Sequence, residues 1–322
     1  MFGSICGSSL LLLLLVTSFR RRRLHSGSNI LVMHLMLLDL IICGITYPLS
    51  ITITYRGMRG TQVDINCHAF LYFHMSVIFT ENWANLVLAI NRLFAIALPF
   101  LYKKITTIPG LIFMIVLPWV MGLGVTLPVY FGIGGALIQT IFPLRACTPA
   151  PRPDGYGIAW ITLGAYVPLA SIGLTYLSLC GRWIIKKVQK RQISPMQNEQ
   201  AERQTAAVKA RQIRLAKMLI ASYLWHCMCF LSPPILLPSF PWLLRRYPML
   251  IQLWLLKTAP MWGYVASPFI FLALSSDYQT GVRDLLNSLR GRRRQMDTSN
   301  RRSQAFVTST VGSGQHGKGT ST

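Results

Sequence analysis

The chain has 322 residues, of which 52% are hydrophobic and 13% are charged, and its formal net charge is +23. A soluble domain is normally about a quarter charged, so this composition argues against a soluble protein and favours a chain that lies largely in lipid. The seven cysteines include no C-x-x-C pair, so a structural zinc site is not expected.

Seven apolar stretches follow one another along the chain, separated by charged or Gly- and Pro-rich segments. They cover residues 5–19, 30–53, 67–97, 108–133, 157–183, 213–240 and 250–275. A membrane-spanning helix needs about 20 apolar residues, which the first stretch does not supply. We therefore expect a short first helix with a segment missing upstream. The pattern predicts an all-α membrane protein with one seven-helix domain over residues 1–290.

Lys and Arg mark one side of this predicted bundle. Arg20–Arg23 follow the first stretch, and the loop over residues 182–217 and the tail from Arg283 are also strongly basic. Basic residues concentrate in cytoplasmic loops, where they meet anionic lipid headgroups. The N-terminus is therefore predicted outside the cell and the C-terminus inside, and membrane lipid rather than nucleic acid explains the basic excess. Residues 291–322, rich in Arg, Ser, Thr and Gly, are predicted to form a disordered cytoplasmic tail.

Polar residues and prolines recur at characteristic places within the apolar stretches. They are His34-Leu-Met-Leu-Leu-Asp39-Leu, Cys67 and Asn91-Arg92-Leu93 in the third stretch, Trp119, the pair Pro168 and Tyr176, and Ser267-Pro268-Phe-Ile-Phe271. This ordered set resembles the motifs of rhodopsin-like (class A) G-protein-coupled receptors: N-L-A-x-x-D-L, D-R-Y, the fourth-helix Trp, the fifth-helix Pro and Tyr, and N-P-x-x-Y. Within that class, Asn-Arg followed by Ala-Ile-Ala-Leu-Pro looks like the melatonin-type and invertebrate Moody-type orphan receptors.

The resemblance implies a seven-transmembrane-helix bundle in the plasma membrane, with a short cytoplasmic amphipathic eighth helix that begins near Tyr278. It also implies a disulfide between Cys67 and Cys147, binding of an extracellular ligand, and activation of heterotrimeric G proteins, with arrestin as a further partner of the tail. No enzymatic activity is expected, and Trp119 is expected simply to pack against its neighbours. The residues implied in G-protein coupling and switching are Asn91, Arg92, Tyr176, Pro268 and Phe271.

Several positions depart from the family pattern. Asn91 stands where the family has an acid, so Arg92 lacks the charged partner that would hold it in the resting state, and we expect elevated basal activity. Phe271 lacks the hydroxyl of the family's Tyr. In the sixth stretch, Pro233 and Pro234 form the predicted hinge, but the Trp of the family's C-W-x-P is absent.

Two carboxylates lie inside apolar stretches, where an ionisable residue is costly and indicates function by default. The family arrangement brings Glu81 of the third helix toward Asp39 of the second and Ser267 of the seventh. Two neighbouring carboxylates do not both ionise cheaply without a cation, so the pair either binds a sodium ion or keeps one proton. The alternative is local pairing of Glu81 with Asn82 or Asn85, and structural pairing is likewise open for Asp39.

The ligand pocket expected from the family positions is lined by residues of three helices: His74, Met75 and Phe79 on the third, Leu231 on the sixth and Lys257 on the seventh. Lys257 would accept an anionic ligand, or else snorkel to the lipid headgroups. For His74, a packed and hydrogen-bonded role is the alternative. We expect the ligand to be a small lipid-like or amphipathic molecule, or a short peptide.

Three rival classes are less well supported. An ion-coupled transporter would use Asp39 and Glu81 as ion ligands, but the inverted repeats common in transporters are not evident. An enzyme is disfavoured because the chain has no H-E-x-x-H motif and no close His and Asp spacing. A light-sensing opsin is disfavoured because Met261 stands where opsins carry the retinal lysine.

Overall fold

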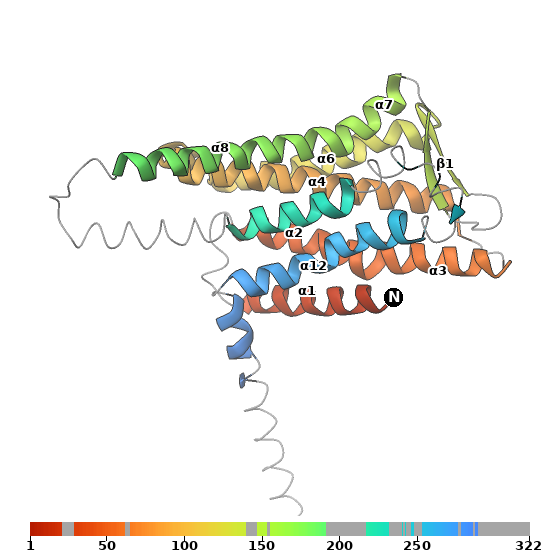
Figure 1. The fold of residues 1–322 in the computed structure, drawn as a ribbon, viewed down its shortest axis with the longest axis horizontal. Helices are drawn as coiled ribbons and strands as arrows, with labels where there is room; N and C mark the ends of the chain where they lie inside the picture. The colour runs from red at the N-terminus through yellow and green to blue at the C-terminus, as the bar shows by residue number, and fades with distance from the viewer. Residues whose placement is uncertain are drawn as a thin grey trace, which may run out of the picture.

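The computed structural model of the chain describes residues 1–20, 29–61, 65–139, 147–152, 155–190, 217–231, 253–275 and 278–285, with a few single residues beyond these ranges. Arg21–Arg23, the loop over residues 191–216, the Pro233 and Pro234 hinge and the C-terminal tail lie outside the described residues. The described helices run roughly along one long axis (Figure 1).

Seven helical passes build the bundle in the described part of the chain. They are α1 (Phe2–Arg20); α2 (Asn29–Ile41) continued by η2 (Ile42–Thr46) and α3 (Tyr47–Met58); α4 (Cys67–Ala97); α6 (Ile108–Tyr130); α7 (Gly155–Ile161) continued by η3 (Thr162–Tyr166) and α8 (Val167–Lys190); the helix Lys217–Leu231; and η4 (Trp254–Thr258) continued by α12 (Ala259–Leu274). The short α5 (Pro99–Ile105) links α4 to α6. The passes follow the predicted apolar stretches, because a helix satisfies its own backbone polar groups in lipid.

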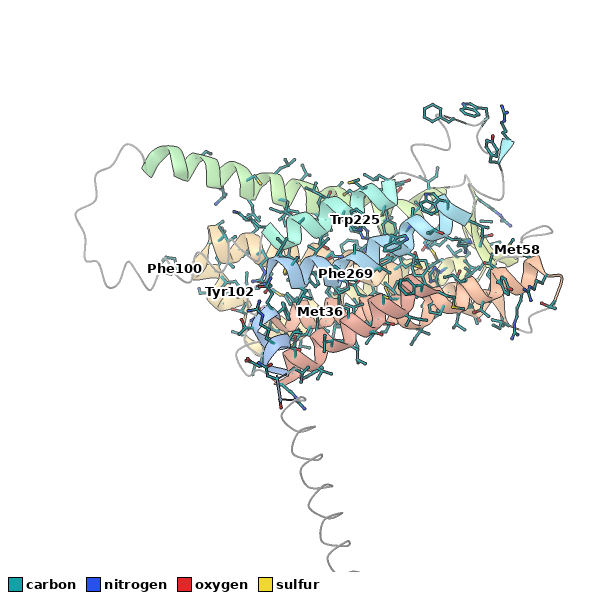
Figure 2. The ribbon with its side chains drawn as sticks, turned by 60° about the horizontal axis from the view of Figure 1, so that its bottom comes forward. Met36, Met58, Phe100, Tyr102, Trp225 and Phe269 are labelled. Atoms are coloured by element: carbon teal, nitrogen blue, oxygen red, sulfur yellow. A yellow bond between two sulfur atoms is a disulfide. The ribbon has the colours of Figure 1, made fainter. Side chains whose placement is uncertain are left out.

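Four described helical stretches are long and apolar enough to cross a membrane: Phe2–Arg20, Asn29–Met58, Ile108–Tyr130 and Gly155–Arg182. Large apolar side chains project outward from α6, where Ile108 and Phe113 are 76% and 63% exposed. Such an outward apolar face is expected of a helix that contacts lipid. In Figure 2, Met36 lies among the helices, whereas Phe100 of α5 stands away from them at one end of the bundle.

The first helix is longer than the apolar stretch that predicted it. α1 begins at Phe2 rather than at residue 5, because small residues extend the helix and pack against α12. Ser4 Oγ lies 3.4 Å from Met261 Sδ, and a Cβ on Gly7 would lie 3.2 Å from Val265. Small residues let helices approach closely in membranes, a role that a hydropathy reading overlooks.

Three passes contain a five-residue π-helix, and each π-helix ends just before an X-Pro pair: Tyr47-Pro48, Val167-Pro168 and Ala259-Pro260. In the fifth pass, the Val167 N–H donates to the Thr162 carbonyl, and Pro168 has no N–H to donate. The carbonyls of Leu163 and Gly164 therefore lose their helical donors. Trp83 Nε1 and Asn82 Nδ2 of α4 donate to these two carbonyls, at 3.1 and 3.0 Å.

A short hairpin covers one end of the bundle and modifies the all-α prediction. β1 (Gly135–Gln139) pairs antiparallel with β2 (Cys147–Pro151), with Gly135 opposite Pro151 (Figure 1). Gly134, with φ 80°, helps to turn the chain from α6 into β1. β2 contains two prolines, Pro149 and Pro151, and prolines argue against a strand when secondary structure is predicted from residue propensities.

After α12 the chain turns, and residues 278–285 are helical, at the position of the predicted eighth helix. Tyr278, Val282 and Leu285 are buried, whereas Arg283 and Asp284 are exposed. This spacing gives the segment one apolar and one polar face.

Candidate functional site

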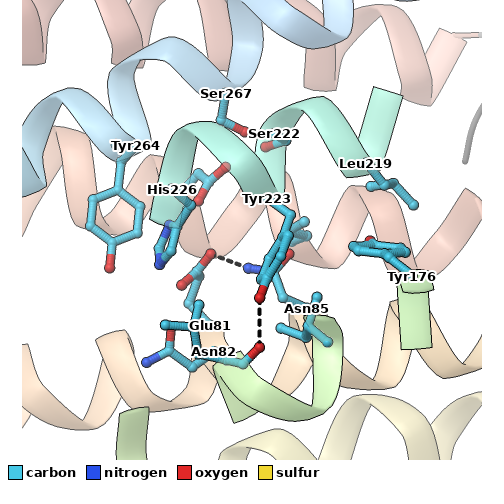
Figure 3. Close-up of a pocket in the computed structure, with 15 residues that line it drawn as sticks. Glu81, Asn82, Asn85, Tyr176, Leu219, Ser222, Tyr223, His226, Tyr264 and Ser267 are labelled. Atoms are coloured by element: carbon cyan, nitrogen blue, oxygen red, sulfur yellow. Dashed lines mark hydrogen bonds between the residues drawn. The ribbon is translucent and has the colours of Figure 1, made fainter. Parts of the chain in front are cut away.

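A polar cavity lies inside the bundle, between five of the helical passes: the second, third, fifth, sixth and seventh. It leaves about 30 Å³ for the centres of water-sized molecules, which is room for one or two waters or a small ion. The lining residues include no Lys or Arg. Polar side chains lining it come from α2, α4, α8, the helix Lys217–Leu231 and α12: Asp39, Glu81, Asn82, Asn85, Tyr176, Ser222, Tyr223, His226, Tyr264 and Ser267 (Figure 3).

The structure brings the two predicted carboxylates and Ser267 together in this cavity. Asp39 and Glu81 are 2% and 3% exposed and interact electrostatically with each other. The Ser267 side chain is hydrogen-bonded to Asp39, and Asn85 Nδ2 donates to Glu81 Oε1. Glu81 Oε2 is buried without a hydrogen-bond partner among the described residues. An acidic pair with one unsatisfied oxygen and no cationic side chain in its lining needs a bound cation or a proton.

The predicted alternative, local pairing of Glu81 with Asn82 or Asn85, therefore accounts for only one of the two carboxylate oxygens of Glu81. Asn85 does pair with one carboxylate oxygen, as that alternative anticipated. Asn82 instead donates to the Gly164 carbonyl of the fifth pass. The second oxygen of Glu81 remains available to the cavity.

Four polar residues that line the cavity were not identified as site residues from the sequence: Ser222, Tyr223, His226 and Tyr264. The His226 ring stacks on Phe230 at 4.0 Å and meets the Tyr264 ring edge-on at 5.7 Å. The Tyr223 hydroxyl donates to the Leu169 carbonyl at 2.8 Å. The polar spacing of Ser222 and His226, one helical turn apart in an apolar stretch, was the signal that could have found this face.

The predicted switch residues lie deep in the bundle. Arg92 is fully buried and interacts electrostatically with Tyr176, which is also buried. The buried Asn91 Nδ2 lies 3.5 Å from Met114 Sδ, and its Oδ1 has no hydrogen-bond partner in the described part of the chain. Phe271 is fully buried in α12, and Pro268 lies inside that helix.

Trp119 makes a specific contact that the sequence analysis did not anticipate. Its Nε1 donates to His34 Nε2 of α2 at 3.0 Å. The fourth-helix Trp therefore joins two passes through a hydrogen bond in addition to packing. The prediction of simple packing was incomplete because the partner lies 85 residues away in the sequence.

The opposite end of the bundle carries the predicted disulfide. Cys67, the first residue of α4, is bonded to Cys147 of β2, with the Cα atoms 5.5 Å apart. The disulfide predicted from the resemblance is confirmed. It ties the hairpin to the third pass, because Cys147 is the first residue of β2.

The five predicted ligand-pocket residues have different surroundings. The Phe79 ring packs edge-on against Trp160, with the ring centroids 5.8 Å apart, and His74 lies between Tyr47 and Phe70, stacked on the latter. Met75 and Leu231 are half-buried in α4 and the sixth pass. Lys257 lines a second cavity, of about 380 Å³, between η4, α12 and α3.

Seven helical passes, a buried acidic pair and a disulfide-tied hairpin at one end of the bundle are the features of a multi-pass membrane protein. The chain belongs to the rhodopsin family of seven-transmembrane receptors, since the model of that family matches residues 11–267. This family consists of receptors and not of enzymes, and membership in it does not favour the transporter alternative.

Two curated relatives match parts of the chain. The chain is 29% identical over 113 residues to 5-hydroxytryptamine receptor 1B of Mus musculus, which covers 35% of this chain and 29% of that protein. It is 26% identical over 162 residues to G-protein coupled receptor 84 of Mus musculus, which covers 48% of this chain and 38% of that protein. The chain thus spans well under half the length of either relative.

The fold is similar to that in the crystal structure of squid rhodopsin. The TM-score is 0.69, and the match covers 89% of this chain and 83% of that chain at 15% sequence identity. The rhodopsin-like seven-helix fold predicted from the sequence is therefore confirmed.

Proposed function

We propose that the protein is a plasma-membrane receptor that binds an extracellular ligand and activates heterotrimeric G proteins. The observation that carries this proposal is Arg92, fully buried at the end of α4 that lies away from the disulfide, beside Tyr176. A buried guanidinium is costly unless partners compensate its charge, so a conformational change that exchanges those partners could use it as a switch. Family membership supports the same role.

The mechanism is a two-state equilibrium. An agonist that binds the active conformation more tightly shifts the population toward it. The sixth helix then swings outward, and Arg92 and Tyr176 form part of a pocket for the C-terminal helix of the G-protein α-subunit. Lys217, the first described residue of the sixth helix, is exposed and supplies positive charge at the same end of the bundle.

The charge distribution supports the orientation. With the N-terminus outside, the disulfide and hairpin face the extracellular medium, where a disulfide persists. The basic loops and tail then face the cytoplasm, where they meet anionic lipid headgroups. The tail, with its Ser and Thr residues, is the segment we assign to arrestin.

The acidic pair is the site we assign to a sodium ion. Asp39, Glu81 and Ser267 supply oxygen atoms around a small cavity, and the unsatisfied Glu81 Oε2 fits such an ion. Oxygen atoms are the ligands that hard cations prefer. A proton on one of the two carboxylates is the alternative occupant.

The lining of the Lys257 cavity supports a proposal for the ligand class. A cation surrounded by apolar side chains suits a small amphipathic molecule better than a short peptide, because a peptide backbone brings many polar groups that such a cavity leaves unsatisfied.

The test of this function is nucleotide exchange on a panel of Gα proteins, in membranes that carry the wild type or Arg92→Ala. We expect exchange above mock membranes in the wild type and a loss to the mock level in the variant at equal surface expression. Equal exchange in wild type and variant would refute Arg92 as the coupling residue. An absence of exchange from every Gα protein, in receptor with its disulfide intact and bound to agonist, would refute coupling itself.

A further inference from the structure

The Lys257 cavity combines a cation with an apolar lining. Lys257 Nζ donates to Ser50 Oγ at 3.2 Å, and Ser50 is only 4% exposed. A snorkelling lysine would direct its ammonium group to the lipid headgroups, whereas this one turns toward the interior. The structure therefore favours the ligand-accepting alternative for Lys257.

The surroundings of Lys257 supply no negative charge to balance it. No Asp or Glu lines the cavity, and no described acidic side chain forms an ion pair with Lys257. On α4, His74 interacts electrostatically with Lys257, and its buried Nδ1 has no hydrogen-bond partner among the described residues. A partly buried ammonium with one neutral partner remains uncompensated, so an anionic group from outside the chain would complete it.

The rest of the lining fits a flexible hydrocarbon chain. Ile51 and Met58 of α3 face Leu253 and Met261 of the seventh pass. Thr54 and Thr258 also line the cavity, but their hydroxyls already donate to carbonyls within their own helices. Methionine side chains adapt to irregular apolar partners, and the volume of about 380 Å³ is in the range of small-molecule sites.

Further positive charge lies at the edge of the cavity that carries Tyr55. Tyr55 lines the cavity, and the guanidinium of Arg59 lies over its ring, 4.5 Å from the centroid. Arg56, in the last turn of α3, and Arg59, which follows that helix, are both exposed. Positive charge around an opening raises the local concentration of anions.

We infer that this cavity binds a free amphiphile with one carboxylate head, paired with Lys257, and one unbranched hydrocarbon tail, which lies against Ile51, Met58, Leu253 and Met261. A single lysine is a compact point charge without the bidentate fork of an arginine, which suits a monoanionic head better than a dianionic phosphate. This inference rests on the proposed receptor function, because it names the ligand class for that receptor.

The experiment measures binding of a radiolabelled straight-chain carboxylate to the full-length receptor in nanodiscs of zwitterionic lipid. Unlabelled carboxylates of increasing length and the matched primary alcohols compete with it. We expect saturable binding, and alcohols that are weaker by roughly tenfold or more, because the buried charge is then left unpaired. Lys257→Gln should lose this preference for the carboxylate, whereas Lys257→Arg should keep it.

Three results would overturn the inference: no saturable binding to the wild type, equal affinity for acid and alcohol, or unchanged carboxylate binding in Lys257→Gln. Ile51→Trp provides a second variant, because a filled cavity should shift the preference to shorter tails while the carboxylate preference remains. An unchanged thermal unfolding midpoint shows that each variant is folded. Displacement of the probe by an anionic phospholipid placed in the nanodisc would assign the cavity to bilayer lipid instead.

Arg92→Ala separates failure of this inference from failure of the proposed function. That variant should bind the carboxylate with wild-type affinity and yet not promote nucleotide exchange. Carboxylate binding without nucleotide exchange in the wild type would support the proposed binding site and refute G-protein coupling. Arg92-dependent nucleotide exchange without carboxylate binding would support G-protein coupling and refute the Lys257 site.

Discussion

Asn91 is buried beside Arg92 and offers it an amide in place of a carboxylate. The Asn91 Nδ2 contact in the described structure is to the sulfur of Met114 at 3.5 Å, and a thioether is a weak acceptor. Asn91 Oδ1, the atom that could accept from the neighbouring guanidinium, has no hydrogen-bond partner among the described residues, so Arg92 gains no charge-assisted bond from this side chain. We therefore expect the resting conformation to be held less firmly at this point than it would be by an acid.

Asn91→Asp should lower basal nucleotide exchange by about tenfold, since a hydrogen bond to a charged group contributes about 1.5–3 kcal/mol. The measurement is agonist-free exchange at matched surface expression. Asn91→Gln is the control, because it changes the side chain without adding charge and should retain high basal exchange. Identical basal exchange in wild type and Asn91→Asp would contradict the role assigned to this residue.

Glu81 on α4 adds a second carboxylate to the polar cavity, which Asp39 on α2 also lines. A sodium ion bound between Glu81 and Asp39 would stabilise the conformation described here, in which Arg92 is buried. We therefore expect sodium to raise the thermal unfolding midpoint of the wild type and to lower its basal exchange, relative to potassium at equal ionic strength. Population shift toward the ion-bound state is the physical reason.

Glu81→Gln keeps the shape of the side chain and removes its charge, so both sodium effects should shrink to the level seen in potassium. Because the unfolding midpoint does not depend on a G protein, it tests the ion site apart from coupling. If the variant responded to sodium as strongly as the wild type does, Glu81 would not be an ion ligand. A wild type that responds to pH but not to sodium would favour the shared proton.

At the scale of helices, α4 and α6 approach each other closely at a glycine. A Cβ placed on Gly122 of α6 would lie 2.6 Å from the Ser76 carbonyl oxygen and 2.7 Å from the Thr80 backbone nitrogen. These are backbone atoms that do not move without displacing the helix. A glycine in a membrane helix permits this kind of packing.

Gly122→Ala should therefore destabilise the receptor by about 1–3 kcal/mol, as overpacking does, and the expected result is a lower thermal unfolding midpoint. Gly124 is the matched control on the same helix, because nothing lies within 4 Å of a Cβ placed there. Gly124→Ala should leave the midpoint unchanged or raise it, since Ala is the better helix former. Equal midpoints in the two variants would show that α6 shifts freely against α4.

At the scale of elements, the three π-helices were not predicted, although the X-Pro pairs that follow them are visible in the sequence. Each ends just before an X-Pro pair, and in the fifth pass the carbonyls left free are taken by Asn82 and Trp83 of α4. The prolines were visible in the sequence. Which neighbouring side chains would satisfy the freed carbonyls was not, because that depends on how α4 is rotated against the fifth pass.

For the whole molecule, the Cys67–Cys147 disulfide closes the longest covalent loop in the described structure, with a sequence separation of 80. Loop-closure entropy predicts a stabilisation of about 4 kcal/mol for a loop of this size. Cys67→Ser, Cys147→Ser and the double variant should each reduce surface expression and the unfolding midpoint to a similar extent. Cys180→Ser, at an exposed free cysteine, is the control and should behave as the wild type.

Similar losses in the single and double variants are the signature of one shared bond. A double variant that loses about the sum of the two single losses would mean that each cysteine acts by its own packing. A reducing agent applied to the wild type should reproduce the loss seen in the variants, and should leave the double variant unchanged.

The sequence by itself determined the class of this protein. The length of the apolar stretches, the one-sided placement of Lys and Arg, and the spacing of Asp39, Arg92, Tyr176 and Pro268 are local or periodic features, readable without tertiary contacts. They predicted the helical passes and the resemblance to the family, and that resemblance implied the disulfide. The first helix begins earlier than predicted, because small residues contribute little to hydropathy. The hairpin was not predicted, because the prolines in its second strand argue against a strand.

The tertiary structure decided which polar groups meet. Only the packed bundle brings His226 and Tyr264 to the cavity of Asp39 and Glu81, and only it turns Lys257 inward to Ser50. The physical reason is that the rotation of each helix about its own axis is set by its neighbours. Close contacts at small residues and carbonyls freed before prolines fix that rotation, and both involve partners far apart in the sequence.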